Sequence, residues 1–427
     1  MYDNNFRNSL LMTFMMLMTS MLSVIPLSYE TEAAGTNQTT TGTLTGTETW
    51  SGSHSLTGDV EVGEGALLII NAGSTINMPA GSFITIKGAM CAGNAACGAT
   101  QASTGSPVRF VWPDATSSDP NATGRCYDPT NSMNNRDLNC GEGLIFKETI
   151  DTSLTALSHV TIDGAYGYPS YIQSSAEFTY AAITFDGASF TADNLNFNNV
   201  NTSSVSAFNL AAPLLKDSTF KLGSDGEGWH AAAVRAFGAG TGILSTFVLE
   251  NSVFTGDDSA ECGSNEDGRS LITAADSYID MNTLTLSQNS YGLFLKGSSG
   301  QFTNSQVSVK CNGVDTNGHK STGDISHTLW VHNNTITTDD GAPLTAYDQA
   351  IVQANDNTLT GAAEGSGIAI RDSTVTAHRN IVGPIAGWNG MWILGDSEVV
   401  AENNTFEGAA KETILIGEYH YLDSGWN

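Results

Sequence analysis

A repeat of about 23 residues towards the C-terminal end, a period typical of solenoids, constrains the fold of this chain more than any other feature. An asparagine recurs at nearly equal intervals, at Asn334, Asn357, Asn380 and Asn404. Four similar segments surround these positions: residues 329–336, 352–359, 375–382 and 399–406. A unit this short buries its apolar face only by stacking on its neighbours, so the period predicts a solenoid.

Apolar and polar residues alternate in each of the four segments. One apolar column contains Leu329, Val352, Val375 and Val399, and a second, two residues later, contains Val331, Ala354, Ala377 and Ala401. Residues two apart point to the same side of a strand, so these segments are predicted to be β-strands. The asparagines follow the strands, where stacked amides at a bend hydrogen-bond along the solenoid axis. We interpret this column as scaffold.

The apolar position two residues after each asparagine extends towards the N-terminus. Its members are Ile162, Phe197, Phe220, Phe254, Leu284, Val307, Ile336, Leu359, Val382 and Phe406, which outline ten coils. The steps that follow Ile162, Phe220, Phe254 and Val307 are longer than the others, which keep the regular interval. Coils of this length without a helical period predict an all-β parallel β-helix.

The stretch from Thr57 to Lys87 looks like the first coils of a known class of surface proteins. Together with the repeats it resembles the right-handed parallel β-helix repeat proteins of the pectin-lyase-like superfamily, of the secreted or cell-surface type, over residues 49–427. The resemblance implies a right-handed parallel β-helix. It leaves the activity open, because the superfamily includes lyases, hydrolases and non-catalytic surface proteins.

One long domain is predicted, because a solenoid grows by adding coils. It spans residues 50–427, with N-terminal coils in 50–150 and repeat coils in 151–427. The net charge of −28, from 44 acidic and 16 basic residues, argues against nucleic acid as a partner. Because the chain stops about one repeat after Phe406, we expect it to end within a coil and to be truncated at the C-terminus.

Residues 1–34 are predicted to be a signal peptide or a membrane anchor, because Leu10–Leu27 is an apolar run whose length lies between those typical of the two. The small residues Ala33 and Ala34 favour a signal peptide. Residues 35–49, rich in threonine and glycine, are predicted to be a linker. We therefore expect a secreted or cell-surface protein.

Six cysteines fit an oxidising compartment. We expect Cys91 to pair with Cys97 and Cys126 with Cys140, since each pair is close in sequence, which leaves Cys262 with Cys311. Metal binding is the alternative, but no C-x-x-C pair occurs. Sequons at Asn37, Asn121, Asn201, Asn333 and Asn403 are compatible with export.

Coils longer than the regular repeat place their extra residues just after the apolar anchor. This predicts four inserted loops on one edge of the solenoid, at residues 163–181, 221–240, 255–269 and 308–323. Their ligand-binding candidates are aromatic, charged or imidazole side chains: Tyr166, Tyr168, Tyr171, Trp229, His230, Arg235, Glu261 and His319. Aromatic rings beside carboxylates and amides suit the apolar face and hydroxyl rim of a sugar. Alternatively, the aromatic residues only pin long loops to the scaffold.

Carboxylates in the third loop suggest a cation site. Asp257, Asp258 and Glu261 offer oxygen ligands of the kind that Ca²⁺ prefers, and the alternative is a set of solvated turn acids. The segments Gly256-Asp257-Asp258 and Gly318-His319-Lys320 are similar to two motifs of polygalacturonase-like hydrolases, but the Asn-Thr-Asp and Arg-Ile-Lys motifs are missing. Pectate-lyase-like enzymes use an Arg or Lys base beside acidic Ca²⁺ ligands, a role open to Arg235, with His230 nearby.

Two further sets of residues lie outside these loops. His332 and His378 share one column two coils apart, about 10 Å by strand spacing, so we expect no shared metal there. Trp388 and Trp392 suggest an aromatic patch near the end of the chain.

Three functions remain open. The first is a secreted or surface-displayed β-helix that binds glycan or another surface ligand without turning it over. The second is a polysaccharide lyase or glycoside hydrolase acting on acidic polysaccharide at the same edge. The third is a structural stalk or adhesin shaft. We expect a monomer, with no cofactor beyond Ca²⁺.

Overall fold

The computed structural model describes residues 38–79, 81–112, 143–165, 181–198, 200, 203–221, 232–238, 245–256, 262, 270–318, 328–361 and 363–417. The chain divides into two units, Met1–Gln38 and Thr39–Asn427, and every described strand belongs to the second. No described residue belongs to a helix with the length and apolar character needed to cross a membrane. The signal peptide or anchor predicted at residues 1–34 lies outside the described residues.

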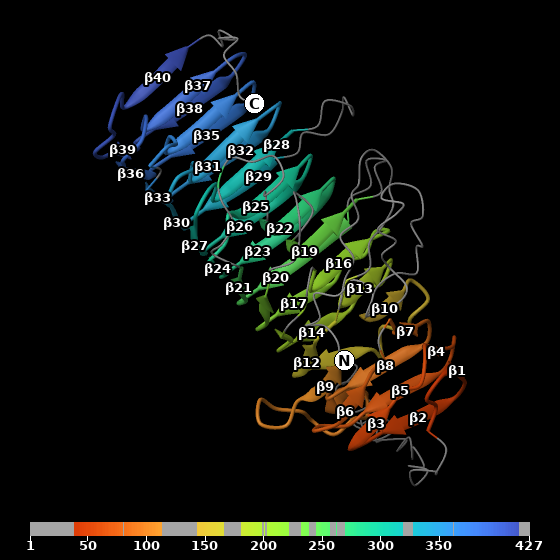
Figure 1. Ribbon diagram of the computed structural model, residues 1–427. Coiled ribbons are helices and arrows are strands. Elements are labelled where there is room, and N and C mark those ends of the chain that lie inside the picture. Colours follow the sequence, from red (N-terminus) through yellow and green to blue (C-terminus); the bar gives the residue numbers. More distant parts are fainter. Residues whose placement is uncertain are drawn as a thin grey trace, which may run out of the picture. The chain divides into compact units, whose positions relative to one another are not determined.

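Within the described residues, forty strands form three parallel sheets, and each sheet takes every third strand of the sequence (Figure 1). Sheet A has 14 strands: β1 (Gly42–Leu44), β4 (Val60–Val62), β7 (Phe83–Ile86), β10 (Gly143–Lys147), β13 (Ile183–Asp186), β16 (Val205–Phe208), β19 (Ala232–Phe237), β22 (Ser270–Ala275), β25 (Tyr291–Lys296), β28 (Val314–Asn317), β31 (Leu344–Tyr347), β34 (Ile368–Arg371), β37 (Met391–Leu394) and β40 (Ile414–Gly417).

Sheet B has 13 strands: β2 (Thr47–Trp50), β5 (Leu67–Ile70), β8 (Ala89–Ala92), β11 (Ala156–Ser158), β14 (Thr191–Asp193), β17 (Leu214–Lys216), β20 (Ser245–Glu250), β23 (Ser277–Asn282), β26 (Ser299–Thr303), β29 (Thr328–His332), β32 (Ile351–Asn355), β35 (Thr374–His378) and β38 (Glu398–Glu402).

Sheet C also has 13 strands: β3 (Ser53–Ser55), β6 (Thr75–Asn77), β9 (Val108–Val111), β12 (Val160–Asp163), β15 (Asn196–Asn198), β18 (Thr219–Lys221), β21 (Val253–Thr255), β24 (Thr285–Ser287), β27 (Gln306–Val309), β30 (Thr335–Thr338), β33 (Thr358–Gly361), β36 (Ile381–Ile385) and β39 (Thr405–Phe406). One short 3₁₀ helix, η1 (Ala95–Cys97), follows β8.

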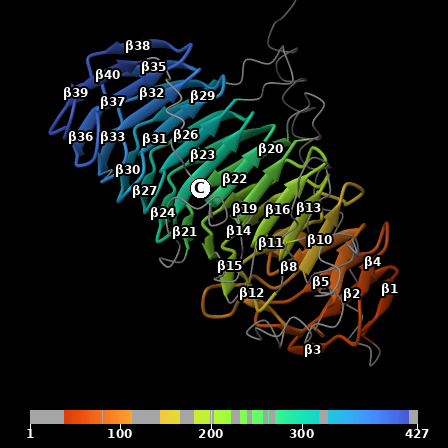
Figure 2. The same cartoon turned by 45° about the horizontal axis from the view of Figure 1, so that its top comes forward.

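Each coil runs through sheets A, B and C in turn and returns to sheet A one strand further along, as both views show (Figure 2). Parallel strands joined by such crossovers are connected with a right-handed turn. The chain is therefore a right-handed parallel β-helix, which confirms the fold predicted from the sequence repeat. The sheets continue without a break across residue 150, since β10 pairs with both β7 and β13.

The interior of the β-helix is one apolar core built from inward-facing columns. In sheet C, Phe197 stacks on Phe220 with ring centroids 5.3 Å apart, and Phe220 stacks on Phe254 at 4.6 Å. The next residue in register is Leu286 and not the predicted Leu284. Leu284 instead lies in the preceding turn, two residues before the strand position, where its amide bonds to Ser305.

The asparagine ladder forms as predicted. Asn334 Nδ2 donates to Asn357 Oδ1 at 3.1 Å, and Asn357 donates in the same way to Asn380 at 3.0 Å. The side-chain oxygen of Asn357 also accepts from the backbone N–H of Asn334 at 3.0 Å. The ladder is therefore a structural element at the turn between sheets B and C. The residue before each ladder position has positive φ, as at Asn333 (55°) and Asn403 (56°), which asparagine tolerates well.

The β-helix begins earlier than residue 50, the boundary predicted for the linker. Strands β1 and β2 lie within the threonine-rich segment and pair with β4 and β5. Leu44 and Trp50 are buried, and Trp50 stacks on His54 with centroids 4.2 Å apart. Threonine has a high strand propensity, so alternation with these two apolar residues is enough to form a first coil.

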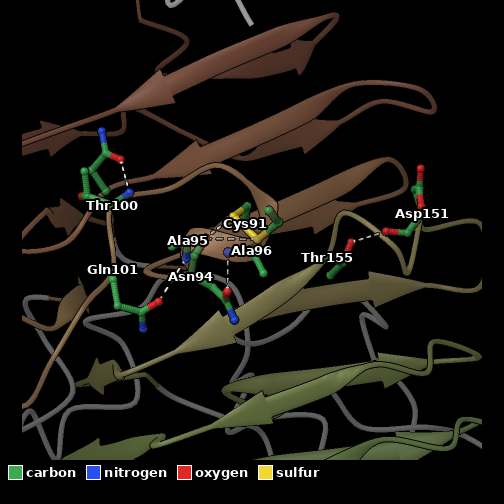
Figure 3. The surroundings of a disulfide bond; sticks show 10 residues. Cys91, Asn94, Ala95, Ala96, Thr100, Gln101, Asp151 and Thr155 are labelled. Atoms are coloured by element: carbon green, nitrogen blue, oxygen red, sulfur yellow. Dashed lines mark hydrogen bonds between the residues drawn. A yellow bond between two sulfur atoms is a disulfide. The ribbon is translucent and has the colours of Figure 1, made fainter. Parts of the chain in front are cut away.

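The disulfide between Cys91 and Cys97 forms as expected. It holds η1 against the outer face of sheet B, where Cys91, Cys97, Leu67 and Ile69 make a small separate apolar cluster. Asn94 caps η1 by accepting from the N–H of Ala96 at 2.9 Å, and Gln101 Oε1 accepts from Ala95 at 3.1 Å (Figure 3). Cys126 and Cys140 lie outside the described residues.

Candidate functional site

The inserted segments occur both between sheet C and sheet A and between sheet A and sheet B, which corrects the prediction of a single edge. Residues 166–180, 222–231 and 257–269 connect a strand of sheet C to the next strand of sheet A. Residues 239–244 and 319–327 connect a strand of sheet A to the next strand of sheet B. Two of the predicted loops contain strands of sheet A, because 221–240 includes β19 and 308–323 includes β28. The departures from the regular coil therefore flank one sheet.

Sheet A presents two outward columns of side chains, recognised by register and by alternation with the core. The first passes in register along the sheet from β16 to β37 through Ser206, Arg235, Thr273, Phe294, Asp315, Thr345, Ala369 and Trp392. The second, two residues further along each strand, passes from β25 to β37 through Lys296, Asn317, Tyr347, Arg371 and Leu394. These columns define the sheet A face, meaning the outward side chains of β16 to β37.

Arg235 lies on β19 and is only 1% exposed, so it is a strand residue and does not lie in a loop. Its guanidinium carbon is 5.6 Å from the ring centroid of Phe237. Burial lowers the pKa of Arg235 to about 10, because desolvation disfavours the charged form. The group still carries its charge at neutral pH.

Asp315 is a buried carboxyl on the outward side of β28. Its Oδ1 accepts from the Thr345 hydroxyl at 2.7 Å and from Asn317 Nδ2 at 3.3 Å, and its Oδ2 accepts from Asn312 Nδ2 at 3.2 Å. Burial raises the pKa of Asp315, while these three hydrogen bonds and the charge of Arg371 oppose the rise. Desolvation is the larger cause, so the carboxyl is a stronger proton acceptor than an exposed aspartate.

Two tyrosines face the same region. Burial, reinforced by the nearby charge of Asp315, raises the pKa of Tyr291 and of Tyr347. Arg371 lies over the ring of Tyr347 with its guanidinium carbon 4.9 Å from the centroid, and its Nη2 is 3.3 Å from Asp348 Oδ1. The side chain of Arg371 is 34% exposed, so part of this cation faces solvent. A buried acid with raised pKa beside an aromatic ring and a cation is typical of functional sites.

The aromatic patch predicted from Trp388 and Trp392 forms at the C-terminal end of this face. The two rings meet edge to face at 5.4 Å, and Lys411 Nζ lies 4.7 Å from the centroid of Trp388. Trp388 is 39% exposed. Trp392 is diagonal to Arg371 across β34 and β37, since Ala369 pairs with Trp392 and Arg371 with Leu394. Aromatic and cationic groups therefore continue along the face from β31 to the turn before β37.

Most of the residues predicted to bind ligand or metal lie outside the described residues. These are Tyr166, Tyr168, Tyr171, Trp229, His230, Asp257, Asp258, Glu261 and His319. Their roles in sugar binding, Ca²⁺ binding and catalysis remain predictions. Within the part of the chain that is described, no three His, Cys, Asp or Glu side chains are grouped closely enough to hold a metal ion.

The expected disulfide between Cys262 and Cys311 also forms, with Cα atoms 5.5 Å apart. Cys311 directly precedes Asn312, the residue whose side chain donates to Asp315 and accepts from the N–H of Ala342 at 3.0 Å. The bond thus ties Cys262, which precedes β22, to the turn that precedes β28. It anchors the border of the sheet A face.

His332 and His378 stay apart, as expected from the strand spacing. They lie on β29 and β35, with Asn355 of β32 between them in register. His332 Nδ1 is 3.3 Å from Asp356 Oδ2, and His378 Nδ1 is 3.7 Å from Glu402 Oε2. Asp356 is also held by Arg379 at 2.6 Å, and the hydrogen bond from Arg379 lowers the pKa of this carboxyl.

The pH dependence of stability should reveal the burial of Asp315. An acid whose pKa is raised in the folded state stabilises the fold fully below its unfolded pKa, and this contribution is lost as pH rises through the folded value. The quantity to follow is the difference in melting temperature, wild type minus Asp315→Asn. We therefore expect this difference to decrease as pH increases from about 4 to about 7. Thermal unfolding of both proteins over this range measures it. A difference that is constant or grows with pH would contradict the burial effect.

The sequence pattern places Asp315 only in a predicted loop, and it does not single out Tyr291, Tyr347 or Arg371. The missing signal was the sheet A strand of each coil, which follows connections of variable length from sheet C. Core-facing residues flank Phe294, Asp315 and Thr345 in the sequence. An alignment of these flanking residues would have revealed the outward column of sheet A.

Comparison with known proteins gives few matches. No protein-family model matches the chain, and no curated protein matches it in sequence. Among solved structures it is similar to the periplasmic alginate epimerase AlgG, with 10% identity over 86% of this chain and 78% of that chain, at a TM-score of 0.43. It is also similar to the Dettilon tailspike protein, with 10% identity over 83% of this chain and 61% of that chain, at a TM-score of 0.32.

Proposed function

We propose that this is a secreted or cell-surface β-helix protein that binds an extended glycan on the sheet A face. The observation that carries the proposal is the convergence on one sheet of the inserted segments and of aromatic, cationic and buried acidic side chains. Outward positions of sheet C are mostly small hydroxyl residues, such as Thr335 and Thr358. The irregular coils therefore distinguish sheet A from the rest of the scaffold.

The chemistry of the face suits a sugar chain. Trp388 and Tyr347 offer ring faces for the C–H side of a pyranose, and Arg371 and Lys296 offer hydrogen-bond donors for its oxygen atoms. Outward positions follow one another at about 4.8 Å from strand to strand, so a ligand lying along the axis meets a further outward side chain at each coil. The segments predicted at 163–181, 221–240, 255–269 and 308–323, apart from strands β19 and β28 that two of them contain, would supply further contacts along the borders of sheet A.

Binding to a polysaccharide array tests the proposal. Arg371→Ala and Trp388→Ala should each weaken binding of the best glycan about tenfold, since truncating a central aromatic or arginine contact typically costs more than about 1 kcal/mol. Val253→Ala, an exposed position on sheet C, is the matched control and should leave binding unchanged. Full affinity in both variants would place the binding elsewhere, and failure of the wild type to bind any glycan would favour a structural shaft.

A second candidate is turnover of the bound glycan by a lyase or hydrolase. The observation that favours it is Asp315, whose buried carboxyl and raised pKa suit proton transfer. The same glycans should then yield unsaturated sugar ends, seen by ultraviolet absorbance, or new reducing ends, and Asp315→Asn should abolish them. Binding without product would leave only the binding function.

A further inference from the structure

Four neighbouring strands of sheet B differ in charge from the strands that flank them, where outward positions hold Asp280 on β23 and Glu398 and Glu402 on β38. Outward positions alternate with core residues along β26, β29, β32 and β35. In these four strands, all within the described residues, no outward position holds Asp, Glu, Lys or Arg. The chain as a whole carries 44 acidic and 16 basic residues. We call these outward side chains the sheet B face.

Trp330 stands at the centre of the sheet B face. It lies on β29 and is 41% exposed. Gln301 of β26 and Gln353 of β32 are its partners in register on either side, at the strand spacing of about 4.8 Å. Figure 1 shows β29 between these two strands. The exposed ring is therefore bracketed by two amides.

The surrounding polar groups are held in place. Gln301 Nε2 donates to Asp280 Oδ1 of β23 at 2.8 Å, which fixes the orientation of that amide. The neighbouring column contains His332, Asn355 and His378, and His332 Nδ1 lies 3.2 Å from the carbonyl oxygen of Asn355. At the adjacent turn, the charges of Asp356 and Arg379 neutralise each other through two hydrogen bonds of 2.7 and 2.6 Å.

We infer that the sheet B face is a second binding surface, and that its ligand is an uncharged polysaccharide chain lying along the solenoid axis. Trp330 would stack on one pyranose ring, while Gln301 and Gln353 exchange hydrogen bonds with the hydroxyl groups of the sugars on either side. The absence of Asp, Glu, Lys and Arg from the outward positions of the four strands matches a ligand without charge. An anionic chain would find no cation on these strands and would meet the net negative charge of the protein.

A second copy of the chain fits this face less well. Stable protein interfaces bury at least about 1,000 Å² around an apolar, tightly packed centre. The sheet B face has a single large aromatic residue and one aliphatic residue, Ile351, among amides, hydroxyls and imidazoles. The residues used are separate from those of the sheet A face, so either surface can fail its test without affecting the other.

The test is sedimentation of the full chain with insoluble amorphous cellulose, chitin and mannan, with alginate beads as the anionic comparison. Binding to at least one of the three uncharged polysaccharides is expected. Trp330→Ala should weaken it at least tenfold, while Trp330→Phe, which keeps a ring, should lose much less. Because no charge is involved, raising the salt to about 0.5 M should change the affinity less than twofold.

Several results would overturn the inference. The first is that the protein binds none of the uncharged polysaccharides, and the second is that wild type and Trp330→Ala bind equally well. The third is a preference for alginate. The fourth is loss of binding in Trp392→Ala, which would place the ligand on sheet A. Analytical ultracentrifugation tests whether the sheet B face binds a second copy of the chain. A wild-type dimer that is lost in Trp330→Ala would identify this face as a self-association surface. Circular dichroism of Trp330→Ala confirms folding, and Val253→Ala serves as the control for an exposed apolar residue.

Discussion

Replacing Phe220 by alanine should lower the free energy of unfolding by about 3–5 kcal/mol, the range for removing a large aromatic side chain from a packed core. Phe220 is fully buried and stacks on a phenylalanine in each neighbouring coil, with centroids 5.3 and 4.6 Å away. Its loss leaves a cavity in the middle of the solenoid, where coils on both sides depend on nearest-neighbour packing. Denaturant unfolding followed by circular dichroism measures the change.

Two variants make the result for Phe220 specific. Val253→Ala lies in the adjacent strand β21 but on the exposed side, at 42% exposure, and should change stability by no more than about 0.5 kcal/mol. Phe220→Leu keeps most of the apolar volume and should fall between the two. If Phe220→Ala cost less than about 1 kcal/mol, the stacked phenylalanines would not be a main source of stability in these coils.

Removing the disulfide between Cys262 and Cys311 should cost about 4 kcal/mol, because it closes a segment with a sequence separation of 49 residues. The cost arises mainly in the unfolded chain, which gains conformational freedom when the link is absent. The bond between Cys91 and Cys97 spans only 6 residues and should contribute about 2 kcal/mol by the same relation. The double variants Cys262→Ser/Cys311→Ser and Cys91→Ser/Cys97→Ser allow a direct comparison.

The decisive result is which of the two double variants loses more free energy of unfolding. If chain entropy determines the cost, removing the disulfide that closes the longer segment should lower the free energy of unfolding more. A larger decrease for Cys91→Ser/Cys97→Ser would show that local packing contributes more than chain entropy. That outcome has a physical basis, since Cys91 and Cys97 belong to a small buried cluster with Leu67 and Ile69. Unfolding of the wild type in the presence of a thiol reductant should show at least the sum of both losses, because the reductant also opens the bond expected between Cys126 and Cys140.

The fold was predictable from the sequence because the strongest constraints recur at a fixed interval. Alternation around Leu329 and Val331 predicted the strands of sheet B, and the stacked asparagines predicted the turn into sheet C. The predicted N-terminal boundary is too late, because the composition of Thr47–Trp50 suits a linker as well as a strand. Its threonines are strand formers once Trp50 reaches the core.

The site was predicted only in part. Insertion lengths indicated four of the irregular coils but not the longest connection, between the end of β9 at Val111 and the start of β10 at Gly143. The pairing of Cys262 with Cys311 was anticipated, because the other four cysteines were paired with near neighbours in sequence. Sheet A itself was not predicted, so Arg235 was placed in a loop although it is a buried residue of β19. Hydrogen bonds between neighbouring strands set the register of sheet A where the connections differ in length. The sequence of one coil does not show this register.

By itself, the sequence determined the class of fold, because a short fixed period with two-residue alternation has few ways to bury its apolar columns other than a β-helix. Only the tertiary structure decided which outward residues become neighbours. Asp315, Tyr347 and Arg371 are far apart in the chain, yet they meet on adjacent strands of sheet A. The physical reason is that stacking brings residues one coil apart to within about 4.8 Å, and the pairing of strands fixes which residues those are.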